Sequence, residues 1–220
     1  EFYKVMNGGV ICDTASNSGY ILPKIMMPSK KIFSLAISDE EQFVKSVLKV
    51  RRNSGAFDFI PLVAFAKDSD AAKAGDTVEV HGAVMTHYEP GRFKKVMMYT
   101  MISYIRKVAD NTLHENIVIL AGVMSRYVDP IYRITPFGRK ICDFTIQRPH
   151  RRKDYTYNIY AIAWGKNASF IASLERGRKI AVKARFQSRV YYKSIDGDES
   201  NKVPIRTYEI SVVSMLPIEL

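Results

Sequence analysis

Alternation of apolar and polar residues with a period of two is the main pattern along this chain. It is clearest at Thr77–Met85, where Val78, Val80 and Val84 alternate with mostly polar neighbours. Because successive side chains of a strand point to opposite faces of a sheet, such a segment predicts a strand with one buried face. Alternating or continuous apolar runs predict further strands at Phe2–Ile11, Lys30–Ser38, Phe57–Ala66, Phe93–Ile105, Asn116–Gly122, Lys140–Ile146, Tyr155–Trp164, Lys179–Phe186 continuing to Tyr192, and Val203–Met215.

Two segments have helical features instead. Asn167–Leu174 predicts a short helix. Ser38 followed by Glu41 has the spacing of a capping box, and an apolar stripe at helical spacing continues toward Gly55. These features predict a capped amphipathic helix over residues 38–55. The alternative for this segment is a long β-hairpin extension.

Irregular segments separate the predicted strands. The small, polar residues of Asp13–Gly19 predict a turn or loop. Pro23 and Pro28 favour an irregular or edge conformation for Tyr20–Pro28. The polar stretch Arg106–Glu115 is a candidate linker between two halves of the chain.

The order of the predicted elements repeats along the chain. Ala64–Lys67 is similar to Ala163–Lys166, Gly75–Val84 to Gly177–Phe186, and Lys30–Ser38 to Arg139–Gln147. Each half then has about five strands with a helix between the third and the fourth, which is the arrangement of an OB-fold barrel. We therefore predict an all-β protein with short helices, built from two tandem five-stranded OB-fold barrels. The first barrel is expected over residues 1–107, with the insertion at 38–55, and the second over residues 114–220.

The composition adds one point to this prediction, because the charge of the chain indicates what kind of ligand it binds. The 220 residues carry a net charge of +11 and have a pI near 9.6, which favours a polyanionic ligand. No apolar run approaches the ~20 residues that a membrane helix needs. Cys12 and Cys142 lie far apart in no metal-binding or redox motif, and we expect reduced thiols in a cytoplasmic protein.

Catalysis finds little support in the sequence. The four histidines are scattered without the spacing of a metal site, and neither cysteine is close to a histidine. The aspartates of the predicted turns are more simply explained as solvated loop residues. We therefore predict a protein that is not an enzyme, with no cofactor and no metal.

Aromatic and basic residues gather around the strands of the second half. Binding a single nucleic-acid strand requires cations along the phosphates and aromatic faces for the bases, at ~1–3 kcal/mol per stacked base. The candidate contacts are Tyr155, Tyr157, Tyr160, Trp164, Tyr191 and Tyr192 on the strands, Arg139, Lys140, Arg148, Arg151, Arg152 and Lys153 on or beside the hairpin between the second and third strands, and a further cluster of Arg126, Tyr127, Tyr132, Arg133 and Phe137. Arg51 and Arg52 are additional candidates, with a charge pair at a helix C-terminus as the alternative.

Alternation divides the aromatic residues of the third strand between its two faces. Tyr160, Ile162 and Trp164 share one face, whereas Tyr157 and Ala163 share the other. Tyr157 then fills the barrel, unless a bulge turns it toward a ligand. The simpler alternatives are a core role for Trp164 and a merely solvated loop for the basic run that follows Arg148.

The second half also contains an ordered set of short motifs between Asn116 and Leu216. They are Asn116, Leu120-Ala121-Gly122, Thr135-Pro136, Gly138, Phe144, Ala163-Trp164-Gly165-Lys166-Asn167-Ala168, Leu174, Gly177, Val182, Arg189 and Tyr191. With these motifs, the second half resembles the bacterial single-stranded DNA-binding protein family, which includes a primosomal replication protein of the same fold. The first half keeps Phe65-Ala66-Lys67 and Gly75, but departs from the family at its first strand and at the insertion. The acidic tail that usually ends the family is not present at Leu216–Leu220.

The resemblance implies particular residues and partners. It implies that Trp164 and Tyr191 stack on bases, with Arg189 beside them. The family's third strand often carries two stacking aromatic residues six positions apart, a spacing that Phe59 and Phe65 keep in the first half. It also implies a homodimer with four OB folds, a nucleoid-associated location, and replication or recombination proteins as partners.

The function predicted from the sequence is binding of single-stranded DNA without sequence specificity, in replication, recombination or repair. Two alternatives stay open. One is a primosome-type assembly or adaptor protein, in which the barrels serve as a scaffold. The other is binding of single-stranded RNA, because a stacking surface accepts either sugar.

Overall fold

The computed structural model describes residues 5–6, 9–10, 14–21, 25–28, 42–65, 71–89, 95–149, 156–195 and 198–216. In the first half, the strands are β1 (Val5–Met6), β2 (Gly9–Val10), β3 (Thr14–Ile21), β4 (Ile25–Pro28), β5 (Gln42–Arg51), β6 (Phe57–Phe65), β7 (Thr77–Glu89) and β8 (Lys95–Lys107). The second half contains β9 (Asn116–Met124), β10 (Ile131–Ile134), β11 (Lys140–Pro149), β12 (Thr156–Trp164), helix α2 (Lys166–Ala172), β13 (Lys179–Ile195) and β14 (Asp198–Leu216).

Each half closes on itself through the same series of strand pairs. In the first half, β3 pairs with β5, β5 with β6, β6 in parallel with β8, β8 with β7, and β7 with β3. In the second half, β9, β11, β12, β14 and β13 close in the same order, again with one parallel pair. These are two five-stranded OB-fold barrels, as the sequence predicted. We call them the first and the second barrel.

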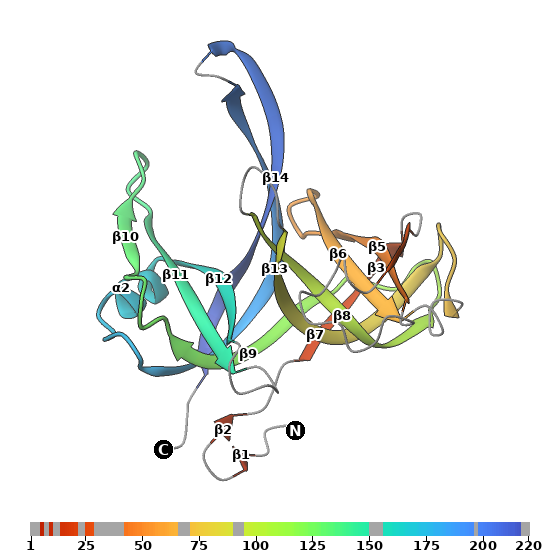
Figure 1. The fold of residues 1–220 in the computed structure, drawn as a ribbon, viewed down its shortest axis with the longest axis horizontal. Helices are drawn as coiled ribbons and strands as arrows, with labels where there is room; N and C mark the ends of the chain where they lie inside the picture. Colours follow the sequence, from red (N-terminus) through yellow and green to blue (C-terminus); the bar gives the residue numbers. More distant parts are fainter. Residues whose placement is uncertain are drawn as a thin grey trace.

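The barrels are joined edge to edge by their first strands. Strand β3 pairs antiparallel with β9, so that both barrels belong to one continuous sheet of 12 strands among the residues described. Antiparallel pairing of equivalent strands places the two barrels in an approximately two-fold arrangement. Figure 1 shows the barrels side by side, with the β13–β14 hairpin rising between them.

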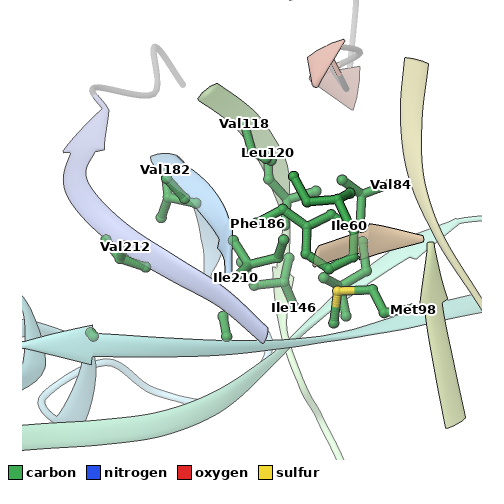
Figure 2. Close-up of a cluster of buried hydrophobic side chains, with 14 of the residues drawn as sticks. Ile60, Val84, Met98, Val118, Leu120, Ile146, Val182, Phe186, Ile210 and Val212 are labelled. Carbon is green, nitrogen blue, oxygen red and sulfur yellow. The ribbon is translucent and has the colours of Figure 1, made fainter. Parts of the chain in front are cut away.

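One apolar cluster runs through both barrels. Figure 2 shows Ile60, Val84 and Met98 of the first barrel packed near Phe186 and Ile210 of the second, and all five side chains are buried. Complete burial of one such side chain stabilises the folded state by roughly 1.5–3 kcal/mol. The two barrels are therefore packed together. Residues 108–115, within the candidate linker at 106–115, connect β8 to β9.

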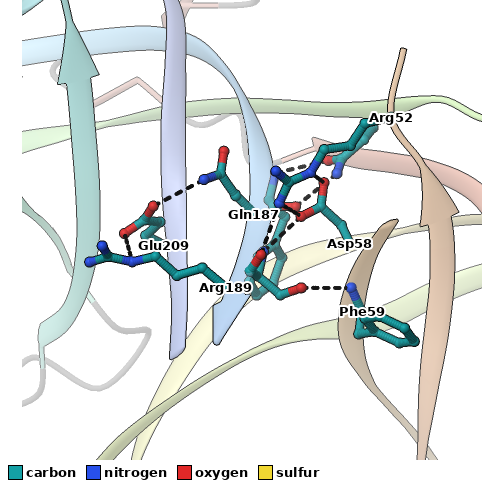
Figure 3. Close-up of polar contacts among 9 residues, drawn as sticks. Arg52, Asp58, Phe59, Gln187, Arg189 and Glu209 are labelled. Carbon is teal, nitrogen blue, oxygen red and sulfur yellow. Dashed lines mark hydrogen bonds and ion pairs between the residues drawn. The ribbon is translucent and has the colours of Figure 1, made fainter. Parts of the chain in front are cut away.

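The hydrogen bonds of a buried ion pair also join the barrels. Asp58 on β6 is 1% exposed and accepts hydrogen bonds from Arg52 Nε at 2.9 Å and from the backbone N–H of Ser188 at 2.8 Å. Arg52 Nη2 also donates to the backbone oxygen of Ser188 at 2.8 Å, and the backbone N–H of Phe59 donates to Ser188 Oγ at 2.8 Å. Figure 3 shows this group, which we call the clamp, between β6 and β13.

The prediction of a helix over residues 38–55 is wrong. Residues Gln42–Arg51 form β5, which is the second strand of the first barrel rather than an insertion. Val44, Ser46, Leu48 and Val50 are buried, while Lys45, Val47 and Lys49 between them are partly exposed, so burial follows a period of two. Pairing with β6 along the whole strand and the β-branched valines favour the strand over the local capping signal.

The first strand of the first barrel was also wrongly placed. It is β3 (Thr14–Ile21), which covers most of the segment Asp13–Gly19 that was expected to be a turn or loop, whereas the described residues of Phe2–Ile11 form only the short pair β1 and β2. Backbone hydrogen bonding to β7, β9 and β5 holds β3 in place despite its small, polar residues. Because β5 corresponds to β11, the proposed match of Lys30–Ser38 to Arg139–Gln147 is wrong as well, and Lys30–Ser38 lies outside the described residues.

The other two repeat matches are confirmed. The parallel pairs Leu62 with Thr100 and Ala161 with Ile210 are equivalent, which places Phe65 and Trp164 at the same position in the two barrels. Gly75 and Gly177 both have positive φ angles, of 92° and 79°, directly before the fourth strands. The short helix predicted at Asn167–Leu174 is α2, shifted by one or two residues.

Candidate nucleic-acid interface

The third strand of the second barrel separates its side chains as the sequence predicted. Along β12, Tyr160 and Trp164 are 46% and 37% exposed, while Tyr157, Ile159 and Ala163 are buried. Ile162 lies on the outward side with Trp164 but is covered. The outward side of β12 therefore presents aromatic rings to solvent, whereas the inward side fills the barrel.

Trp164 lies in an open hollow that is lined by cations. The hollow has a volume of about 780 Å³ and is lined by Gly138, Arg139, Lys140, Trp164, Gly165, Lys166 and Ser169. The chain can turn sharply around it because Gly138 and Gly165 adopt positive φ angles of 74° and 57°. One flat aromatic face and three basic residues are the components that a base and its flanking phosphates require.

The turn at one edge of this hollow is fixed by its own hydrogen bonds. The backbone N–H of Gly138 donates to the backbone oxygen of Thr135 at 2.9 Å, and that of Arg139 donates to Thr135 Oγ1 at 3.0 Å. Phe137 lies at the tip of the turn and is 91% exposed. A fully exposed ring on an ordered turn is available to a stacking ligand.

The outward face of β12 continues across β14 onto β13. Ile162 lies opposite Ser211, Glu209 opposite Gln187, and Tyr191 opposite Ile205. Paired residues share a face and the register is unbroken over this part of β14, so Tyr191 lies on the same side of the sheet as Trp164. We call this continuous surface, with Tyr160, Trp164, Arg189 and Tyr191, the Trp164 face.

A charged group forms the middle of the Trp164 face. Glu209 is buried and accepts a hydrogen bond from Gln187 at 3.2 Å, and it forms an ion pair with Arg189 at 3.2 Å. Burial raises the pKa of the Glu209 carboxyl, while Arg189, Arg52 and Arg133 oppose the increase. Arg189 is itself half exposed, so its guanidinium stays within reach of a ligand.

The β10–β11 hairpin supplies further exposed groups. Tyr132 on β10 is 40% exposed, and Arg133 forms an ion pair with Asp143 on β11. Arg139 and Lys140 are exposed at the start of β11. Arg126 is exposed as well, but it lies beside Gln147, toward the other end of β11.

Two predicted contact residues of the second barrel are used in the junction between the barrels. Tyr157 is 7% exposed, and its hydroxyl donates to Met85 Sδ of the first barrel at 3.9 Å. Arg148 donates to the backbone oxygen of Val84 at 3.4 Å and lies over the Tyr157 ring, and burial lowers its pKa. Tyr157 is therefore buried, and the packing of Arg148 leaves its side chain only partly exposed.

The first barrel does not repeat the Trp164 face. Phe65, at the position of Trp164, is half-buried with its ring 4.9 Å from that of Phe43. Phe43, Val63 and Tyr99 around it are almost fully buried and form an apolar cluster of their own. The aromatic residue that the family spacing suggested for stacking is therefore part of a packed cluster.

The remaining candidates of the first half lie elsewhere. Arg52 belongs to the clamp, whereas the Arg51 side chain is exposed. Phe59 is half-buried, with the Arg206 guanidinium 4.1 Å from the centre of its ring. Tyr155, Arg151, Arg152 and Lys153 lie outside the described residues.

Sequence reasoning missed several residues of these surfaces. Lys166 lines the hollow directly after Gly165, and its place in the Ala163–Lys166 repeat was the available signal. Phe57 is 37% exposed with Lys49 Nζ 4.1 Å from the centre of its ring. Lys49 was missed because it was assigned to a helix, and Arg206 because its contact comes from the other barrel.

The structure shows no group suited to metal ions within the described ranges. No cluster of three or more His, Cys, Asp or Glu side chains is found there. Cys142 is buried with a free thiol, and burial raises its pKa. Among the helices described, none is long and apolar enough to cross a membrane.

Comparison with known proteins agrees with this geometry. Residues 115–213 match the Single-strand binding protein family, which confirms the resemblance drawn for the second half. The fold is similar to the wild-type single-stranded DNA binding protein from Thermus aquaticus, with 16% identity, 94% of each chain covered and a TM-score of 0.68. A deletion mutant of that protein gives 16% identity and a TM-score of 0.67, covering 94% of this chain and 95% of the other. At such low identity these structures establish a shared fold across both barrels. Comparison with curated proteins found no match.

Proposed function

Because residues 115–213 match the Single-strand binding protein family, we propose that this protein binds single-stranded DNA without sequence specificity. The observation that carries the proposal is the exposed Trp164 ring in a hollow lined by Arg139, Lys140 and Lys166. The ring accepts an unstacked base, and the three cations contact the phosphates on either side. Neither interaction reads the identity of the base, so the binding is independent of sequence.

The strand follows the Trp164 face from the hollow toward the β13–β14 hairpin. Tyr160 adds a second ring on β12, and Tyr191 adds a third on β13, 46% and 45% exposed. Arg189 lies two residues before Tyr191 on the same face of β13. A chain of alternating rings and cations of this kind suits several consecutive nucleotides.

Two alternative functions give different binding results. Single-stranded RNA uses the same rings and cations, and it is separated from DNA only by contacts to the 2′-hydroxyl. An assembly or adaptor protein of the primosome type would use the barrels as a scaffold and would have little affinity for nucleic acid. The Trp164 hollow favours a nucleic-acid ligand over the adaptor role.

The proposed biological setting follows from the family. We infer a role in replication, recombination or repair, in a nucleoid-associated protein that works with other proteins of these processes. A homodimer of this chain would hold four OB folds. The mass of the protein in solution tests this point, because a monomer at working concentration would contradict it.

Trp164 makes a direct test available, since it is the only tryptophan of the chain. Titration of the protein with oligo-dT, oligo-U and duplex DNA, followed by tryptophan fluorescence, reports on stacking at this position. We expect strong quenching by oligo-dT, weaker binding of duplex, and a decrease in affinity with salt as counterion release requires. Quenching by oligo-U alone would favour the RNA function. No response to any of the three would contradict the proposal and favour the adaptor.

A further inference from the structure

Side chains continue the hydrogen bonding of β13 beyond the end of a neighbouring strand. On the edge opposite β14, β9 pairs with β13 from Lys179 to Ala184. Beyond that point, Asn116 Oδ1 accepts a hydrogen bond from the backbone N–H of Phe186 at 2.8 Å, and Asn116 Nδ2 donates to the backbone oxygen of Phe186 at 2.7 Å. The amide side chain therefore satisfies this part of the edge as a paired strand would.

The clamp holds the next part of the same edge from the first barrel. Asp58 Oδ1 accepts from the backbone N–H of Ser188, and Arg52 Nη2 donates to the backbone oxygen of Ser188, both at 2.8 Å. Arg52 Nε also donates to Asp58 at 2.9 Å, so the carboxylate and the guanidinium hold each other in place. Because both backbone groups of Ser188 are bonded, the peptide group that leads into Arg189 is fixed.

Arg189 is consequently held at both its backbone and its side chain. Adjacent side chains of a strand point to opposite faces, so Ser188 faces away from the Trp164 face while Arg189 lies on it. The Arg189 guanidinium forms its ion pair with Glu209 at 3.2 Å and is half exposed. Figure 3 shows Asp58 and Arg52 on one side of β13 and Glu209 on the other. The two contacts together define where the guanidinium meets a ligand.

The barrel fold does not require a carboxylate at the position of Asp58. Val63 and Ile162 occupy equivalent positions, so Asp58 corresponds to Tyr157 in the second barrel. Tyr157 also reaches across the junction, where its hydroxyl donates to Met85 Sδ at 3.9 Å. A buried carboxylate is costly in free energy unless it is paired and hydrogen-bonded, whereas a buried ring is not. The carboxylate therefore indicates a use that the ring does not have, which is to hold a backbone N–H.

We propose that Asp58 is a positioning residue for the binding of single-stranded DNA, acting from the first barrel through Ser188 on Arg189. The inference rests on the function proposed above. Asp58 is 1% exposed and so does not itself contact the strand. A guanidinium that is already held in place loses less entropy when it binds a phosphate, so the affinity depends on the clamp. The first barrel thereby supports binding at the Trp164 face of the second.

The direction of the change in affinity separates positioning from charge. Removal of a carboxylate increases the net positive charge, which by itself strengthens the binding of a polyanion. Asp76→Asn removes a first-barrel carboxylate that is paired with Lys107, and it is therefore the charge-matched control. Asp58→Ala and the milder Asp58→Asn are compared with it by fluorescence anisotropy of labelled oligo-dT at several salt concentrations. Thermal unfolding first shows which variants are folded, and Asp58→Asn decides the test if Asp58→Ala does not fold.

We expect Asp58→Ala to bind oligo-dT at least roughly 5-fold more weakly, because part of a charge-assisted contact worth roughly tenfold or more is lost. Asp58→Asn keeps one acceptor oxygen and should bind more tightly than Asp58→Ala but more weakly than Asp76→Asn. The slope of log affinity against log salt should decrease by ~0.7 in Asp58→Ala and in Arg189→Ala, as for one phosphate contact on a single strand. Combined with Arg189→Ala, either Asp58 variant should cause no further loss of affinity.

Two results would overturn the role of Asp58 while leaving the proposed function intact. One is binding by the folded Asp58 variants that equals or exceeds that of Asp76→Asn. The other is a loss in the double variant that equals the sum of the two single losses in free energy, because Asp58 would then act other than through Arg189. If the unaltered protein does not bind oligo-dT, the proposed function itself fails.

Discussion

The two barrels have the same strand connections, but their third strands differ in where they carry an aromatic ring that is exposed or lies next to a cation. In the second barrel, the strand ends on the exposed Trp164, and Asn158 lies six residues before it. In the first barrel, the ring at the end, Phe65, packs against Phe43, while Phe59 lies under Arg206 near the beginning. The cation and aromatic chemistry is therefore divided between the barrels rather than repeated in each.

This division shows how little the barrel fold constrains its outer surface. At the positions of Val63 and Tyr99, the second barrel has Ile162 and Glu209. One arrangement gives an apolar cluster and the other a charged group with Gln187 and Arg189, yet both support the same strand pairs. Function belongs to these outer residues, because the inward-facing residues serve the common core.

We expect the largest effect on the free energy of unfolding when an ion pair of the first barrel is removed, compared with one of the second barrel. Asp58→Ala removes the buried partner of Arg52 and leaves the guanidinium half-buried, which should lower the free energy of unfolding by ~3–5 kcal/mol. Asp143→Ala removes the partner of Arg133, where the Arg133 and Asp143 side chains are 45% and 32% exposed, and should cost ~0–1 kcal/mol. Urea unfolding of the two variants gives both values. Equal losses would show that the clamp does not hold the barrels together.

A smaller effect tests the charged group on the Trp164 face. Because burial raises the pKa of Glu209 above its ordinary value of 4.5, the folded state holds this proton more tightly than the unfolded state. This contribution to stability is complete below the unfolded pKa and is lost as the pH increases through the folded pKa. Glu209→Gln should therefore gain stability relative to the unaltered protein as the pH increases from about 4 to about 7.

Thermal unfolding across this range measures the difference between the two proteins. The first barrel offers the control, because Tyr99 occupies the corresponding position and carries no carboxyl group. Tyr99→Phe should leave the dependence on pH unchanged. A Glu209→Gln variant whose stability relative to the unaltered protein does not change with pH would show that Glu209 is not destabilised by burial.

The second barrel was predictable from the sequence because local signals and tertiary structure agree there. Alternation assigned the faces of β12 correctly, and the strand, helix and strand from Tyr157 to Tyr192 are found where they were expected. In the first barrel, local and tertiary signals conflict. Polar residues at β3 and helix-like spacing at β5 are overridden by backbone pairing with strands distant in the sequence.

The candidate site residues fall into two groups: those whose exposure depends on one barrel alone, and those that contact the other barrel. Trp164, Tyr160 and Tyr191 are exposed on one face, which alternation and resemblance could indicate within one barrel. Tyr157 and Arg148 contact Met85 and Val84 of the other barrel. No pattern within a single strand contains that contact, so the sequence could not reveal these two as junction residues.

The central claim is that the second barrel binds single-stranded DNA through Trp164 while Phe65, at the same position in the first, does not take part. The direct measurement is the affinity of labelled oligo-dT for Trp164→Ala and Phe65→Ala, by fluorescence anisotropy on folded protein. Loss of one stacking ring costs ~1–3 kcal/mol of binding, so Trp164→Ala should bind roughly 5- to 150-fold more weakly. Phe65→Ala should lose stability and bind within about 2-fold of the unaltered protein, because its ring packs on Phe43. Unchanged binding by Trp164→Ala, or an equal loss in both variants, would contradict the account.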